Sequence, residues 1–78
     1  MEFESAKKIV EGKSGSLSQS QLLMFYGLFK QATVGDCNTG RPGMLSFKAK
    51  SKWDAWNSNT GMSKEDAAKK YCEEAEKL

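Results

Sequence analysis

The 78-residue sequence contains no histidine, and this absence removes the commonest general base of enzyme active sites. It also removes every Ser-His or Cys-His pair and leaves no set of zinc ligands. We therefore expect a protein that is not an enzyme, with no catalytic residue, no metal site and no cofactor.

Long apolar runs are missing as well. No segment approaches the ~20 apolar residues of a membrane span, so we expect no stable membrane insertion. The chain starts with an acidic Met-Glu-Phe-Glu run and lacks the apolar stretch of a secretory signal. The two cysteines, Cys37 and Cys72, form one disulfide at most, and we expect both to be reduced in a cytoplasmic protein.

The net charge of +2 is unevenly spread along what we expect to be a single small domain, residues 1–78. Residues 30–52 carry five basic side chains against one acidic side chain, and the remainder carries seven against nine. The first segment is therefore +4 and the remainder −2. This concentration favours an anionic ligand of defined size over a nucleic-acid surface, which would need a more basic domain. Solvated lysines on a helix are the plain alternative.

Apolar residues recur at three- and four-residue spacing in four segments, and this pattern predicts four helices and no strand. We expect the helices over residues 2–13, 19–34, 47–60 and 64–77. The Ser-Gly-Ser run after the first helix predicts a flexible link. The connection of about eleven residues before the third helix exceeds the usual helix-to-helix loop, so it should cross the domain. The fold class is therefore an all-α helix bundle.

Capping motifs support three of the helix starts. Ser18 and Gln21 fit a capping box, in which each side chain bonds to the backbone N–H of the other residue. Ser63 and Asp66 resemble a second box, and Ser46 is a candidate cap for the third helix.

Basic and aromatic side chains are concentrated around the second and third helices. Lys30 follows Tyr26 by one helical turn, and Lys48 and Lys52 share one face of the third helix. If these faces converge, ammonium groups and a phenol would surround one phosphate, and a ring would pack on a base. Packing in the core is the commoner role for any one ring. The candidate ligand contacts are Tyr26, Phe29, Lys30, Lys48, Lys52 and Tyr71.

Four motifs follow one another in a fixed order. They are Tyr-x-x-Phe-Lys-Gln-Ala-Thr-x-Gly-Asp at 26–36, Asn-x-x-Arg-Pro-Gly at 38–43, Lys-x-Lys-x-Lys-Trp-Asp-Ala-Trp at 48–56 and Gly-Met-Ser-Lys-Glu-Asp-Ala at 61–67. In order and spacing they resemble the acyl-CoA-binding protein family. The resemblance implies an up-down-down-up four-helix bundle. It also implies non-catalytic binding, intracellular transport and buffering of medium- to long-chain fatty acyl-CoA esters.

The resemblance further implies a role for individual side chains. Tyr26, Lys30 and Lys52 would hold the phosphate on the CoA ribose. Phe29 and Tyr71 would pack near the adenine.

The same resemblance assigns side chains to the remaining parts of the ligand. Lys48 would assist at the phosphates, and the groove that covers the acyl chain would be bordered by Ala6, Leu22 and Leu23.

Three features depart from the family pattern. Phe29 stands where many members have tyrosine, so stacking is kept and a hydroxyl is lost. Glu11 stands where many members have a basic residue, which disfavours a phosphate contact from the first helix. The last helix stops at Leu78, earlier than in longer members, so further C-terminal contacts would be absent.

The resemblance implies a monomer whose partner is a long-chain fatty acyl-CoA, and it is compatible with transient contacts to acyl-CoA-using enzymes or membranes. Two other classes stay open and are disfavoured. A thioester hydrolase would need Cys37 or Cys72 as its nucleophile. A single-strand nucleic-acid module would use the interleaved lysines and rings, and we expect no nucleic acid as partner.

Overall fold

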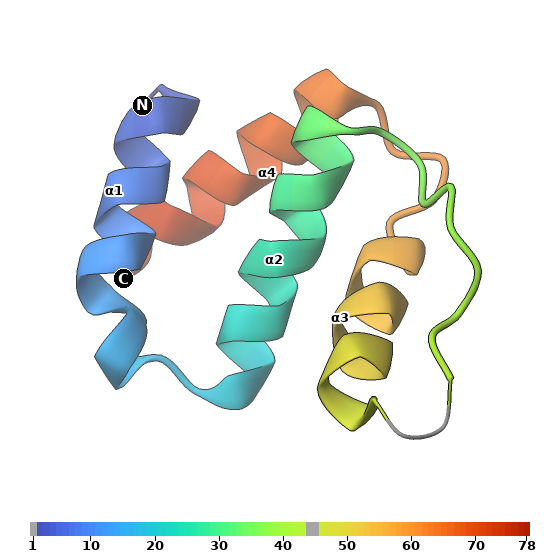
Figure 1. Ribbon diagram of the computed structural model, residues 1–78. Coiled ribbons are helices and arrows are strands. Elements are labelled where there is room, and N and C mark those ends of the chain that lie inside the picture. The colour runs from blue at the N-terminus through green and yellow to red at the C-terminus, as the bar shows by residue number, and fades with distance from the viewer. Residues whose placement is uncertain (1, 44–45) are drawn as a thin grey trace.

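The computed structural model describes residues 2–43 and 46–78, and this part of the chain contains four α-helices, one short 3-10 helix and no strand. The helices are α1 (Phe3–Lys13), α2 (Gln19–Thr33), α3 (Phe47–Asn57) and α4 (Lys64–Glu76), and the 3-10 helix η1 (Ser14–Ser16) follows α1. α2 runs antiparallel to α1, α3 runs parallel to α2, and α4 returns in the direction of α1 (Figure 1). The predicted all-α, up-down-down-up bundle is confirmed.

Hydrogen bonds explain the starts of α2 and α4. Gln21 N–H donates to Ser18 Oγ at 3.1 Å and Ser18 N–H donates to Gln21 Oε1 at 2.9 Å, so the predicted capping box is present. At α4, Asp66 N–H donates to Ser63 Oγ at 3.0 Å. Ser46 is the N-cap residue of α3, as predicted, but its side chain makes no capping hydrogen bond.

Two predicted segments differ from the structure. The Ser-Gly-Ser link is the 3-10 helix η1, because the Ser14 and Ser16 hydroxyls bond back to Glu11 O and Lys13 O at 3.0 and 2.9 Å. The third helix ends at Asn57, three residues before the expected end, where the chain continues in turns. There the Thr60 N–H donates to Asn57 O at 3.1 Å, a bond that spans three residues and not four.

α2 lies between its neighbours and packs against both α3 and α4, while α1 packs against α4. This arrangement explains the wide apolar face of α2. Phe25 and Leu28 of α2 are 3% and 2% exposed, and Tyr71 of α4 contacts the Phe25 ring edge-on, with ring centres 5.1 Å apart. The buried core cluster consists of Ala6, Val10, Phe25, Leu28, Tyr71, Cys72 and Ala75.

The connection between α2 and α3 crosses the domain, as predicted, along the outer side of α3 (Figure 1). Two indole groups of α3 hold it there: Trp56 Nε1 donates to Gly35 O and Trp53 Nε1 donates to Thr39 O, both at 2.8 Å. The Arg41 guanidinium forms two hydrogen bonds to the Asp54 carboxylate, at 3.0 and 3.1 Å. These bonds let α3 begin at the same end of the molecule as α2.

Candidate functional site

Two contacts between a cation and a ring join α2 to α3. Lys52 Nζ lies 5.4 Å from the centre of the Tyr26 ring, and Lys30 Nζ lies 4.9 Å from the Trp56 ring. Tyr26 and Lys30 are four residues apart on α2, and Lys52 and Trp56 are four apart on α3. Because the two helices are parallel, Tyr26 faces Lys52 and Lys30 faces Trp56. We call this arrangement the cation junction. It brings Lys30 and Lys52 to one side of the molecule.

A cavity of about 250 Å³ opens beside the cation junction, between α1, α2 and α4. We call it the ring cavity. Three of the predicted ligand contacts meet here, namely Tyr26, Phe29 and Tyr71, together with Leu22 from the predicted acyl groove. The complete lining is Lys7, Val10, Glu11, Leu22, Phe25, Tyr26, Phe29 and Tyr71.

A second cavity, of about 220 Å³, lies between the long connection and α3, and we call it the indole cavity. Tyr26 lines this cavity as well as the ring cavity, so one phenol borders both. Lys52 lines it from α3. The complete lining is Tyr26, Thr39, Pro42, Ala49, Lys52, Trp53 and Trp56.

Four predicted side chains line neither cavity, and one of them is Lys30, whose ammonium lies over the Trp56 ring. Lys48 is exposed on α3, and Leu23 is half-buried on α2. Ala6 has no exposed surface and belongs to the buried core cluster. Roles for Lys48, Leu23 and Ala6 in ligand binding stay predictions.

Lys7 and Glu11 line the ring cavity. The family resemblance had already placed Glu11 near a phosphate of the ligand, whereas the sequence did not lead us to expect Lys7 there. Lys7 Nζ lies 5.3 Å from the centre of the Phe3 ring and 5.6 Å from that of Phe29. A signal was present in the four-residue spacing of Phe3, Lys7 and Glu11, which puts all three on one face of α1.

The Tyr71 hydroxyl can donate a hydrogen bond at the ring cavity. Burial raises the pKa of Tyr71, and the nearby Glu11 and Cys72 raise it further. A phenol is neutral at physiological pH even at its ordinary pKa of about 10, so the upward shift leaves the donor in place. Phe3 packs on Tyr71 edge-on, with ring centres 5.0 Å apart, and stacks on Phe29 with an interplanar angle of 13°.

The cysteines lie apart from both cavities. Cys37 Sγ donates to Thr39 O at 3.9 Å, and Cys72 is buried in the core. Neither lines the ring cavity or the indole cavity. Within residues 2–43 and 46–78, no group of three or more potential metal ligands comes together.

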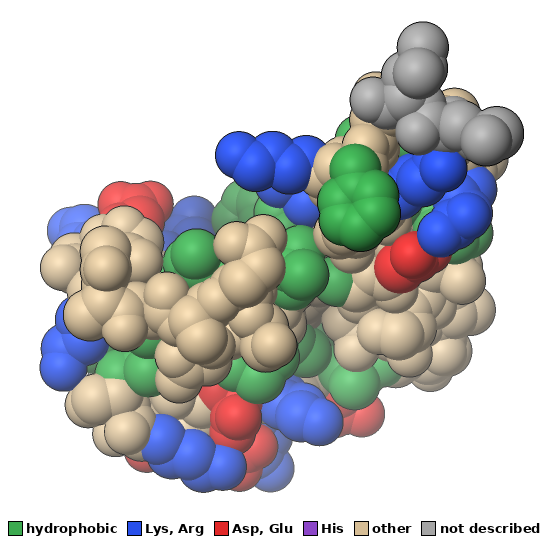
Figure 2. Space-filling model, turned by 90° about the horizontal axis from the view of Figure 1, so that it is seen from below, with side chains coloured by type: hydrophobic (Ala, Val, Ile, Leu, Met, Phe, Trp, Pro, Cys, Tyr) green, Lys and Arg blue, Asp and Glu red, His purple; other side chains and the backbone are tan. Residues whose placement is uncertain are grey.

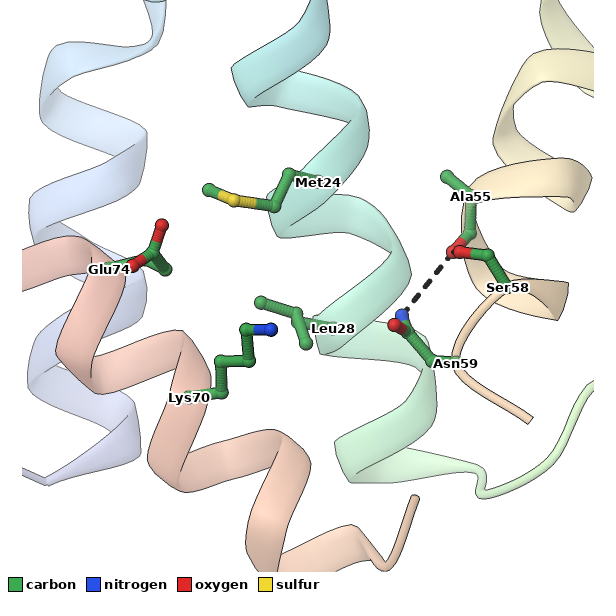
Figure 3. A pocket seen from close by; sticks show the side chains of 7 residues that line it. All are labelled: Met24, Leu28, Ala55, Ser58, Asn59, Lys70 and Glu74. Atoms are coloured by element: carbon green, nitrogen blue, oxygen red, sulfur yellow. Dashed lines mark hydrogen bonds between the residues drawn. The ribbon is translucent and has the colours of Figure 1, made fainter. Parts of the chain in front are cut away.

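A third cavity, of about 290 Å³, lies on another side of α2, between α3 and α4 (Figure 3). It holds none of the predicted site residues. Its lining is Met24, Leu28, Ala55, Ser58, Asn59, Lys70 and Glu74.

Exposed apolar surface occurs next to basic side chains at the end of the molecule where α3 begins (Figure 2). Phe47, the first residue of α3, is 82% exposed and is followed by the exposed Lys48. Among the described residues, no helix has the length and apolar character needed to cross a bilayer.

Comparison with known proteins agrees with this geometry. A family model described as "Acyl CoA binding protein" matches residues 1–75. A putative acyl-CoA-binding protein from an animal of the genus Hypsibius is 46% identical over 77 residues, which cover 99% of this chain and 86% of the relative. Acyl-CoA-binding protein homolog 1 of Caenorhabditis elegans is 44% identical over 78 residues, which cover 100% of this chain and 91% of the relative.

A solved structure shares the fold. The crystal structure of acyl-CoA-binding protein 2 of Oryza sativa superimposes with a TM-score of 0.83 at 40% sequence identity, over 96% of this chain and 87% of that one. The family match thus extends over nearly the whole sequence, and the fold match includes all four helices. The chain belongs to the acyl-CoA-binding protein family.

Proposed function

We propose that this protein binds medium- to long-chain fatty acyl-CoA esters and transports and buffers them without catalysing a reaction. The observation that carries the proposal is the cation junction beside the ring cavity. Two lysines lie 5.4 and 4.9 Å from ring centres at one helix interface, next to a cavity lined by Phe29 and Tyr71. An anionic nucleotide with an apolar tail combines the chemical groups that such a surface favours.

In this proposal the CoA head is held mainly by charge. Tyr26, Lys30 and Lys52 bind the phosphate on the ribose, and Lys48, which is exposed one turn before Lys52, assists at the phosphates. Phe29 and Tyr71 offer ring surfaces to the adenine.

The acyl chain is held by burial of apolar surface. Each buried methylene is worth about 0.8 kcal/mol, so roughly a dozen carbons supply on the order of 10 kcal/mol before ordering costs. A nanomolar complex needs about 12 kcal/mol net, so the head and the tail must both contribute. Leu22 borders the ring cavity, and we propose that Leu23 lies along the same path. Ala6 has no exposed surface, so a contact with the acyl chain would require the core to open around it.

The experiment that tests the proposal is calorimetry with three ligands. Dodecanoyl-CoA should bind far more tightly than free CoA, and dodecanoate should bind hardly at all, because neither half suffices alone. Equal affinity for CoA and its ester would refute the proposal. Incubation with the ester should release no free CoA above background, whereas release would favour a thioester hydrolase.

We further propose that the protein acts as a cytoplasmic monomer and makes transient contacts with donor membranes or acyl-CoA-using enzymes. Both cysteines are free, in keeping with a reducing compartment. The exposed Phe47 beside Lys48 suits brief contact with an anionic lipid surface. Phe47→Ser should then slow ester transfer from phosphatidylserine vesicles; an unchanged transfer rate would contradict this membrane contact.

A further inference from the structure

Lys7 brings a cation to the ring cavity from α1. Its Nζ lies 5.3 Å from the Phe3 ring centre and 5.6 Å from the Phe29 ring centre, and its side chain is 26% exposed. The stem therefore covers apolar ring surface while the ammonium keeps some contact with water. Among the lining residues of the ring cavity, Lys7 is the one that carries a positive charge.

Among the residues that the structure describes, the Lys7 ammonium pairs with Glu4, and this pair is weakly held. Lys7 Nζ lies 2.9 Å from Glu4 Oε1, and the Glu4 side chain is 75% exposed. An ion pair with one partner this exposed contributes little to stability, because water screens the charges and holding two long side chains in one geometry costs entropy. Lys7 can therefore exchange Glu4 for a phosphate oxygen at small cost.

Glu11 places the opposite charge in the same cavity. It lies one helical turn after Lys7 and shares the same face of α1. A carboxylate repels a phosphate, so α1 favours a phosphate near Lys7 and disfavours one near Glu11.

We propose that Lys7 binds a phosphate of the CoA part of the ligand and supplies from α1 the cation that Glu11 does not. The inference rests on the proposed function and assigns a binding residue that the sequence alone did not indicate. It also revises the expectation that α1 makes no phosphate contact. Lysine suits this role as a compact charge with three donors on a flexible stem.

The decisive variant is Lys7→Met, which keeps an apolar stem on Phe3 and Phe29 and removes the charge. Loss of a charge-assisted hydrogen bond should weaken dodecanoyl-CoA binding roughly tenfold to a hundredfold. The matched control is Lys8→Met, which changes the net charge equally at an exposed position of the same helix outside the cavity lining. It should change affinity by less than about threefold.

Three further measurements separate a ligand contact from a packing role. Lys7→Arg should restore most of the affinity. Lys7→Met should flatten the dependence of the dissociation constant on salt more than Lys8→Met does. Glu11→Gln should tighten binding, because it removes the repelling charge, and this variant is informative even if Lys7→Met folds poorly.

A second ligand identifies the phosphate. If the loss in Lys7→Met persists with the dodecanoyl ester of dephospho-CoA, Lys7 binds the diphosphate; if the loss disappears, Lys7 binds the ribose phosphate. Equal affinities of Lys7→Met and Lys8→Met for both esters would overturn this inference and leave the proposed function intact. An unmodified chain that binds neither ester would overturn both.

Discussion

Tyr26 and its neighbours show how single residues prepare the site. The Tyr26 ring lines both the ring cavity and the indole cavity, and it lies under Lys52, while Lys30 lies over Trp56. A cation over a ring face gains about 0.5–1 kcal/mol at partly exposed sites. A phosphate oxygen offers a stronger, charge-assisted bond. We infer that the two rings hold both ammonium groups close to the proposed site of the ribose phosphate. Each ammonium can then leave its ring for a phosphate oxygen at small cost in free energy.

At this scale we predict that Lys30→Ala and Lys52→Ala each weaken acyl-CoA binding by about 1.5–3 kcal/mol, through loss of a charged hydrogen bond. Both variants should fold, because neither lysine belongs to the buried core. Calorimetry measures the affinity and thermal unfolding checks the fold. Lys50→Ala is the control, since Lys50 is on α3 and takes part in neither contact of the cation junction. Unchanged affinity in both test variants would remove the cation junction from the binding site.

Gly27 sets the distance between two elements, α2 and α3. A Cβ at this position would lie 2.4 Å from Ala55 O and 2.8 Å from Ala55 C, both backbone atoms. Backbone atoms cannot rotate away as a side chain does, so the helices would have to move apart. The cation junction depends on this close approach, because its two contacts span the same helix pair.

At the scale of elements, Gly27→Ala should destabilise the fold by about 1–3 kcal/mol, the usual cost of overpacking. It should also weaken acyl-CoA binding beyond any loss from partial unfolding, because the junction widens. Denaturant unfolding and calorimetry at low temperature measure the two effects. Gly12→Ala is the matched control in α1: nothing lies within 4 Å of its added Cβ, so stability should stay equal or rise. A Gly27→Ala variant with unchanged stability and unchanged acyl-CoA affinity would show that the distance between α2 and α3 is unimportant.

The buried side-chain amide of Gln31 connects three segments of the chain. Gln31 has no exposed surface, and its Nε2 donates to Asp36 Oδ1 at 2.8 Å and to Met62 O at 2.7 Å. Gly61 N–H donates to the same Asp36 oxygen at 2.9 Å. These bonds connect the end of α2, the long connection and the turn before α4. The hydrogen bonds from Gly61 and then Gln31 hold the pKa of Asp36 below its ordinary value.

At the scale of the whole molecule, we predict that part of the stability depends on Asp36 being ionised. Its pKa is lower in the folded state, so its stabilising contribution is complete above the unfolded pKa of about 3.9 and is lost as pH falls through the folded value. Asp36→Asn should lower stability at pH 7 and flatten its decline below about pH 4. Urea unfolding between neutral and acidic pH measures both.

The decline should not vanish in Asp36→Asn, because the Arg41 guanidinium holds the pKa of Asp54 below its ordinary value as well. In the double variant Asp36→Asn with Asp54→Asn, the free energy of unfolding should fall even less as the pH is lowered. An identical acid profile for the unmodified chain and Asp36→Asn would contradict the role of this carboxylate.

Local chemistry explains why so much of the fold was predictable from the sequence. The capping box of Ser18 and Gln21 depends on two residues three positions apart. The end of α2 is equally local: the chain leaves the helix at Gly35, whose φ of +102° suits glycine. The prediction for residues 14–16 was wrong because glycine and serine favour a flexible link, whereas serine hydroxyls can also bond to a helix end. The Ser14 and Ser16 hydroxyls bonded to the end of α1, so the segment that looked like a flexible link is helical.

The site was predictable only in part, because its side chains come from different helices. The sequence by itself determined four helices, the capping box at the start of α2 and a family pattern that includes Tyr26, Lys30 and Lys52. Only the tertiary structure decided that Lys7 lines the ring cavity and that Ala6 is fully buried. The physical reason is that spacing along a chain sets which residues share a helix face, whereas the close approach at Gly27 and the course of the long connection set which faces meet.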